Sequence, residues 1–222
     1  MSDSLREQPS LRVAVVGGVL LVVALYVMIT SDAFGTIRYT SSEMRGWYAN
    51  GACWVAALLV ALYARRVEGR GVLLWAERPP KLKFTAVAVI ALLVMLGVFL
   101  TILSVLWRQL ASPEPSGMQG LEKFAPLMSN GVLVFSAFTA GITEEFLFRG
   151  YMLPRVVELT GRNWMAILLT SLFFGLAHYR QDDLKAMVFP MLIGVAFSLF
   201  YVQYRSILVL MICHVTIDLV LF

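Results

Sequence analysis

Long apolar runs fill most of this chain, and the short stretches between them hold most of its charged residues. A helix needs about 20 residues to cross the hydrocarbon core of a bilayer, and it satisfies its own backbone polar groups there. The runs lie at residues 12–30, 47–64, 84–106, 127–149, 164–180, 186–203 and 206–222. The pattern predicts an all-α fold, a polytopic membrane helical bundle of about seven transmembrane helices, or eight if a re-entrant segment is present.

The position of the charged residues divides the chain into regions. We expect the fourth run to continue as a helix past Arg149 toward Glu158, and the last run is short. The whole chain, 1–222, is interpreted as one integral-membrane domain. Residues 1–120 hold N-terminal spans without motifs, and residues 127–222 hold the helices with candidate catalytic groups. A stretch containing proline and glycine at 109–125 separates the two regions.

Composition and charge agree with a membrane protein. Apolar residue types make up 59% of the 222 residues and charged types 14%, against about 25% charged residues in a soluble domain. Basic residues fall in short loops and not along one polar face, so nucleic acid is not an expected partner. The expected partners are the lipid bilayer and a peptide or membrane-protein substrate, and the sequence leaves the oligomeric state open. The two cysteines, Cys53 and Cys213, match no zinc-binding spacing.

The distribution of lysine and arginine predicts the orientation. The loop after the second run is the most basic one, and cytoplasmic loops carry an excess of such residues. Alternation of the spans then places the N-terminus in the cytoplasm. The same side receives Arg149, Arg155, Arg162 and Arg205. The small size and short N-terminus are typical of bacterial proteins, so we expect an integral protein of the bacterial inner membrane.

Ionisable residues inside three of the apolar runs are the candidate functional groups, because a charged residue at mid-membrane costs roughly 2.5–3.5 kcal/mol on insertion scales. Glu144 and Glu145 are adjacent, and Glu145 and Arg149 have the i, i+4 spacing of a helical ion pair. This pairing leaves Glu144 free to face elsewhere. The chain has two histidines, His178 and His214, and both lie in apolar runs.

The histidines have neighbours at helical spacing. Phe174 precedes His178 by four residues, so the two share a helix face. Asp218 follows His214 by four residues, and a carboxylate there can accept from one ring nitrogen and leave the other nitrogen to work. A charge cluster that anchors a helix end, or a polar contact between helices, remains the structural alternative for each group.

A helical hairpin would bring Glu144 and His178 to the same depth. The stretch between the fourth and fifth runs contains Gly161, and Glu144 lies 17 residues before it, whereas His178 lies 17 residues after it. In an antiparallel pair of helices, equal offsets from the turn give equal depth at about 1.5 Å per residue. The prediction requires the fourth helix to continue through Pro154.

Glutamate, histidine and aspartate suit hydrolysis of an amide. One route uses zinc with an open coordination position, for which Glu144, His178 and His214 are the candidate ligands. The other is metal-free, with a glutamate that activates water and histidines that stabilise the oxyanion. A transporter or proton relay is disfavoured, since the first three runs offer almost no buried polar residues. A bis-histidine haem protein would leave the paired glutamates without a role.

The three motifs, Glu144-Glu145-x-x-x-Arg149, Phe174-x-x-x-His178 and His214-x-x-x-Asp218, together resemble the CPBP family. That family includes the type II CAAX prenyl endopeptidases and bacteriocin-processing or abortive-infection-type membrane proteins. The resemblance covers 139–222 and implies an intramembrane endopeptidase, a hydrolase of metallo- or glutamic type. Glu144 would then activate water, Glu145 and Arg149 would complete its motif, and His178 and His214 would bind or stabilise the reacting centre.

One residue departs from the prenyl protease pattern. Asp218 stands where the last motif of those enzymes usually has asparagine, which argues against prenylated CAAX proteins as substrates. The same resemblance leaves a second possibility open, a non-catalytic immunity or scaffold membrane protein that binds a peptide or a membrane partner. Such a protein would tolerate Glu144→Gln.

Overall fold

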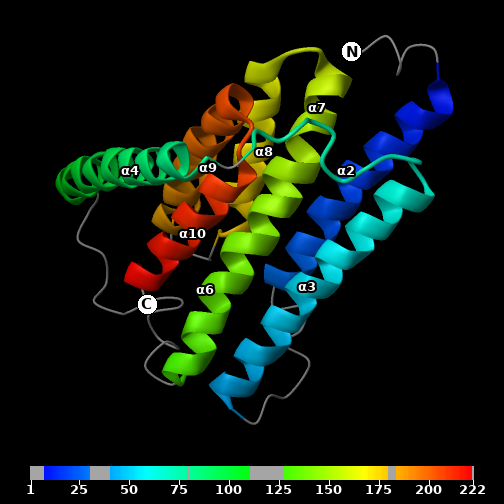
Figure 1. Cartoon of the computed structure of the whole chain (residues 1–222). Helices are drawn as coiled ribbons and strands as arrows, with labels where there is room; N and C mark the ends of the chain where they lie inside the picture. The colour runs from blue at the N-terminus through cyan, green and yellow to red at the C-terminus, as the bar shows by residue number, and fades with distance from the viewer. Residues whose placement is uncertain (1–7, 31–40, 80, 111–127, 180–183, 222) are drawn as a thin grey trace.

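Each of the seven predicted runs corresponds to a helical segment in the computed structural model (Figure 1), which describes residues 8–30, 41–79, 81–110, 128–179 and 184–221. No strand occurs among these residues. The elements are α2 (Pro9–Thr30), α3 (Ser42–Arg66), α4 (Leu82–Leu110), α6 (Asn130–Glu144), η3 (Glu145–Met152), α7 (Leu153–Thr160), α8 (Asn163–Ala177), α9 (Lys185–Tyr204) and α10 (Ile207–Leu221). The predicted all-helical class is therefore confirmed. Most of the expected linker at 109–125 lies outside the described residues.

The helices differ in whether they are long enough to cross a bilayer. Within the described residues, five helical stretches have the length and apolar composition of a span: α2, α3, α4, the continuous stretch from α6 to α7, and α9. Helices α8 and α10 have 15 residues each, against about 20 for a full crossing. An integral membrane protein is thus supported, while the count of seven crossings stays a prediction.

The fourth segment continues well past Arg149, as expected. Helix α6 passes directly into η3, a stretch of π-helix with a wider turn, and then into α7. Pro154 lies at the start of α7, where a missing backbone N–H disturbs the helix least. The helix ends at Gly161, whose φ of 70° is the left-handed conformation that favours glycine at a C-cap.

The π-helical segment η3 lies at the centre of the fold. It contacts α2, α3, α8, α9 and α10, and the side chains of Leu147, Phe148, Tyr151 and Met152 are buried. Packing in a membrane protein cannot rely on excluding water from apolar surface, so close contact and interhelical polar bonds hold such helices together. The centre of the bundle is also where the paired glutamates and Arg149 lie.

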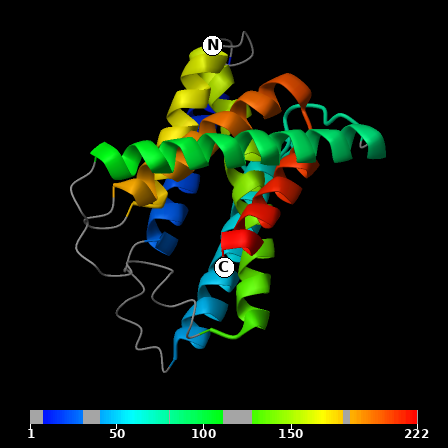
Figure 2. The same cartoon turned by 90° about the vertical axis from the view of Figure 1, so that its left-hand side faces the viewer.

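Helix α4 departs from a simple arrangement of alternating helices. It packs on α10 and runs across the axes of α3 and α6 instead of alongside them (Figure 2). Most of its large apolar side chains are exposed. The alternation used to place the N-terminus in the cytoplasm therefore stays a prediction, as does the bacterial inner membrane.

Two of the arginines counted as loop charges are buried in the fold. Arg149 is 1% exposed and pairs with Glu145, and Arg155 is fully buried against Glu68. Their charges are neutralised within the protein, and the side of the membrane on which they lie stays a prediction.

The first three spans, which were expected to offer almost no buried polar residues, do hold a few, and these join helices. Asn50 of α3 is 6% exposed and donates to Ser136 of α6 over 2.9 Å. One turn further, Trp54 donates to Thr139 over 3.1 Å. Both contacts join α3 to α6, as polar side chains do between helices in lipid.

Candidate active site

Glu144 lies beside His178, as the hairpin spacing predicted, and also beside His214. It is the last residue of α6 and is 7% exposed. The Nε2 atom of His178, which follows α8, lies 4.0 Å from Glu144 Oε2, and the Nε2 atom of His214 on α10 lies 3.7 Å from the same oxygen. This oxygen has no hydrogen-bond partner among the residues that the structure describes. Three separate helices thus bring one acid and two imidazoles together.

Both imidazoles are oriented through Nδ1. His178 Nδ1 lies 2.7 Å from the backbone oxygen of Phe174, and a carbonyl only accepts, so Nδ1 carries the proton. His214 Nδ1 lies 2.8 Å from Glu145 Oε1, and an ionised carboxylate likewise accepts. In each ring, Nε2 is the nitrogen left to face Glu144.

Glu145 has the orienting role that was expected of Asp218. Its Oε1 atom accepts from Arg149 Nη1 over 2.7 Å as well as from His214. The predicted ion pair between Glu145 and Arg149 is confirmed, with side chains that are 0% and 2% exposed. Asp218 Oδ2 instead lies 3.7 Å from His214 Nε2, the ring nitrogen that also faces Glu144.

The π-helix explains how two adjacent glutamates serve different partners. Glu144 ends the regular helix and Glu145 begins the π-helical turn. Segments of this kind are rare and occur often at functional sites. Sequence reasoning did not predict this segment, because its residues form an ordinary apolar pattern.

Aromatic rings enclose the charged groups. The Phe174 ring centre lies 4.7 Å from that of His178 and 6.1 Å from that of His214. The Arg149 guanidinium lies over Phe174 at 4.5 Å and over Phe197 at 5.5 Å. Rings of this kind keep the local dielectric low, so the ion pairs and hydrogen bonds inside are strong.

The candidate zinc ligands are spaced somewhat more widely here than a bound zinc ion holds its ligands. Among the described residues, no group of three or more His, Cys, Asp or Glu side chains is placed to hold a metal ion. A tetrahedral zinc ion with bonds of about 2.0–2.2 Å holds its ligand atoms roughly 3.4 Å apart, closer than Glu144 is to either histidine here. A zinc site at Glu144, His178 and His214 therefore stays a prediction.

The N-terminal helices contribute residues that sequence reasoning missed. Tyr26 of α2 is 3% exposed, and its hydroxyl lies close enough to interact with Glu144. The Cys53 thiol of α3 lies beside Thr143, the residue before Glu144. Tyr26 also packs edge-on against Phe148, with ring centres 5.0 Å apart. Lone tyrosine and cysteine residues in apolar runs carry no motif, so no sequence signal distinguished them.

An apolar cavity of about 140 Å³ lies beside this site, between α2, η3 and α8. Tyr26 and Phe148 line it together with Ala177, which precedes His178. The region with the candidate groups therefore has an apolar space on the side of α2. Tyr26 therefore brings α2 to the site, although residues 1–120 hold none of the predicted motifs.

Comparison with known proteins agrees with the resemblance seen in the motifs. Residues 126–220 match the family model of the type II CAAX prenyl endopeptidase Rce1-like proteins, which is consistent with the CPBP family. The match covers all six predicted site residues and slightly less than half of the chain. No curated protein and no solved structure matches the chain significantly.

Proposed function

We propose that this chain, whose C-terminal region matches a family of intramembrane proteases, is an intramembrane endopeptidase that uses water activated by Glu144. Its substrate would be a peptide bond in a membrane-associated protein or peptide. The observation that carries the proposal is the position of Glu144 Oε2 between two imidazole nitrogens, with no hydrogen-bond partner among the described residues.

The distances in the site suit a bridging water. Separations of 3.7 and 4.0 Å between Glu144 Oε2 and the two Nε2 atoms are too long for direct hydrogen bonds. A water molecule that donates to Glu144 and to His178 Nε2 would span the 4.0 Å gap between them with hydrogen bonds of about 2.8 Å. This arrangement places the nucleophile beside its base before substrate arrives.

The reaction then follows general acid–base chemistry. Glu144 takes one proton as the water oxygen bonds to the carbonyl carbon, and returns that proton to the amine nitrogen as the C–N bond breaks. His214 in its protonated form, held by Glu145 and flanked by Asp218, donates from Nε2 to the oxyanion. His178 orients the water, and Arg149 fixes Glu145.

Cleavage by purified protein in liposomes tests the proposal. The substrate set consists of fluorogenic peptides with apolar anchors, and the comparison is wild type against Glu144→Gln. We expect Glu144→Gln to lower kcat at least 100-fold with an unchanged thermal midpoint. Glu158→Gln is the matched control. Glu158 pairs with Arg70 near the C-terminal end of α7, and both side chains are partly exposed to solvent. Retained cleavage in Glu144→Gln would remove Glu144 as the base.

Metal analysis addresses the zinc route separately. Bound zinc is measured in the wild type and in the His178→Ala/His214→Ala protein. One zinc per chain that is lost in the double variant would establish a metallopeptidase. Equal metal content in both proteins would support catalysis by glutamate.

A further inference from the structure

The segment from Val67 to Pro79, which we call the strap, crosses one end of the bundle between α3 and α4 (Figure 1). It has no regular secondary structure, and it contacts the helices that carry the candidate active site. Two of its glutamates, Glu68 and Glu77, account for most of these contacts. Neither was among the predicted functional residues.

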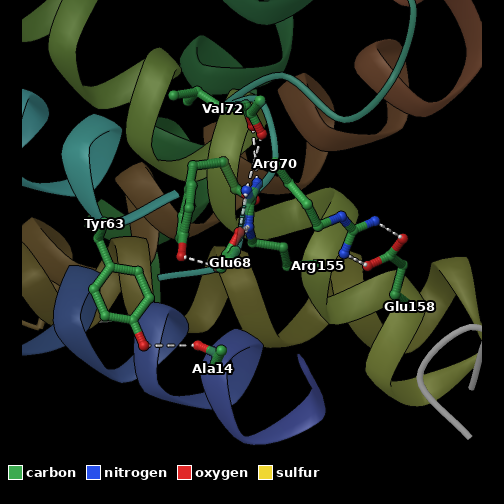
Figure 3. Close-up of polar contacts among 9 residues, drawn as sticks. Ala14, Tyr63, Glu68, Arg70, Val72, Arg155 and Glu158 are labelled. Carbon is green, nitrogen blue, oxygen red and sulfur yellow. Dashed lines mark hydrogen bonds and ion pairs between the residues drawn. The ribbon is translucent and has the colours of Figure 1, made fainter. Parts of the chain in front are cut away.

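Glu68 forms the first anchor of the strap, at the end of η3 (Figure 3). Its carboxylate accepts from Tyr151 Oη over 2.6 Å and from Arg155 Nε and Nη2 over 2.9 and 2.5 Å. Arg155 uses its remaining donors on the backbone oxygens of Val72 and Gly71, at 2.8 and 3.1 Å. This buried pair has its polar atoms satisfied, which is the condition for a stable buried ion pair.

The strap also lies directly against η3 beside Arg149. A Cβ atom on Gly150 would come within 2.7 Å of Leu73 in the strap and within 3.0 Å of Ile207, the first residue of α10. A larger residue at this position would require the side-chain ends of Leu73 and Ile207 to move. The three elements therefore meet one residue after Arg149.

Glu77 forms the second anchor, at the start of α10. Its Oε2 atom accepts from the backbone N–H of Ile207 over 2.8 Å, and its Oε1 atom accepts from Tyr201 Oη over 2.5 Å. The first N–H groups of a helix lack partners within the helix, and a negative charge there is favourable. Arg78 adds a backbone bond of 2.7 Å to the oxygen of Arg205.

We infer that the strap sets the position of η3 relative to α10 and thereby maintains the hydrogen bond between Glu145 and His214, with Glu77 and Glu68 as positioning residues. One anchor holds the element that carries Glu145, and the other holds the element that carries His214. The claim that the strap affects catalysis rests on the proposed function. The claim that it maintains the hydrogen bond between Glu145 and His214 does not depend on that function.

The short distance between Ile207 and His214 along α10 means that a movement at the anchor reaches the hydrogen bond of His214. His214 lies seven residues after Ile207, about 10 Å along a stiff helix. A movement of α10 by about 1 Å would stretch the 2.8 Å bond between His214 and Glu145 beyond the limit of a hydrogen bond. Misplacement of this size can lower a catalytic rate about 100-fold.

The test compares Glu77→Ala with Glu158→Ala. Glu158 also pairs with the strap, through Arg70 Nη2 at 2.6 Å, but it lies on α7, and its side-chain hydrogen bonds within the described residues go to Arg70 and not to η3 or α10. We expect Glu77→Ala to lower kcat by roughly 10- to 100-fold with KM changed less than twofold, and Glu158→Ala to leave both unchanged. Glu77→Gln, which keeps one acceptor oxygen, restores part of the rate.

A second readout does not depend on activity. The chain has two histidines, so protein labelled with ¹⁵N-histidine gives few ring signals, and His178→Gln assigns them. In Glu77→Ala we expect the His214 Nδ1 signal to move toward that of a ring without a hydrogen bond, while the His178 signals stay in place. If Glu77→Ala does not fold, Glu77→Gln is measured in its stead, with a smaller movement of the same signal expected.

The outcomes separate the two hypotheses. Folded Glu77→Ala with an unchanged His214 signal overturns the inference, whatever its activity. An equal loss of rate in Glu77→Ala and Glu158→Ala also overturns it. The loss would then follow from removing any glutamate that pairs with the strap, and not from the contact with α10. Failure of the wild type to cleave any peptide contradicts the proposed function alone, and the His214 signal still decides the role of the strap.

Discussion

Replacement of Arg149 by alanine is expected to destabilise the protein by about 3–5 kcal/mol, because it leaves a buried carboxylate without its cation. The Glu145 and Arg149 side chains are 0% and 2% exposed, and their atoms approach to 2.7 Å. The guanidinium also lies over Phe174 at 4.5 Å, a contact worth roughly 0.5–2 kcal/mol. His214 keeps its hydrogen bond to Glu145 in the variant, so we expect a value in the lower half of the range.

The chain supplies a matched control in a second arginine–glutamate pair. Arg70 and Glu158 approach to 2.6 Å, but their side chains are 24% and 19% exposed. The hydrogen bonds that Arg70 donates to Glu158 raise the pKa of Arg70 within this pair. Solvent screens it, and Arg70→Ala is expected to cost about 0–1 kcal/mol.

Unfolding in detergent, followed by tryptophan fluorescence, measures both effects. The double variant Glu145→Gln/Arg149→Met removes both charges at similar volume, and we expect it to regain at least half of the stability lost in Arg149→Ala. A loss in Arg149→Ala no larger than in Arg70→Ala would refute the reasoning. So would a double variant less stable than Arg149→Ala, since the cost would then not come from an uncompensated charge.

Two further predictions follow from close contacts in the structure. Gly18→Ala should lower the thermal midpoint strongly, because the new Cβ atom would lie 1.7 Å from Tyr151 Oη, whereas Gly97→Ala, with nothing within 4 Å, should stabilise α4 by up to about 1 kcal/mol. Equal midpoints for the two variants would contradict this packing. Asp218→Asn should lower kcat less than tenfold, since an amide can still face His214 from 3.7 Å. Complete loss of cleavage would show that the negative charge is required.

The local arrangement of several site residues follows directly from helical geometry. Glu145 and Arg149 are four residues apart, and the structure pairs them. The equal offsets of Glu144 and His178 from Gly161 placed them at one level, and their atoms lie 4.0 Å apart. Spacing works here because one turn, fixed by a glycine at φ 70°, joins two nearly continuous helices.

Other features depend on contacts between segments that are distant in the chain. The choice of Glu145 over Asp218 as the partner of His214 Nδ1 results from the packing of η3 on α10, and i, i+4 spacing alone favoured the wrong carboxylate. Tyr26 approaches Glu144 from the first helix without any motif. Glu77 meets Ile207 across 130 residues.

The sequence by itself determined the helical class, the membrane environment and the set of ionisable groups, since apolar run length and helical period depend only on neighbouring residues. Only the tertiary structure decided which oxygen meets which nitrogen, that α4 crosses the bundle, and that η3 is a π-helix. These depend on how helices from different parts of the chain pack, and a change of about one ångström there makes or breaks a hydrogen bond.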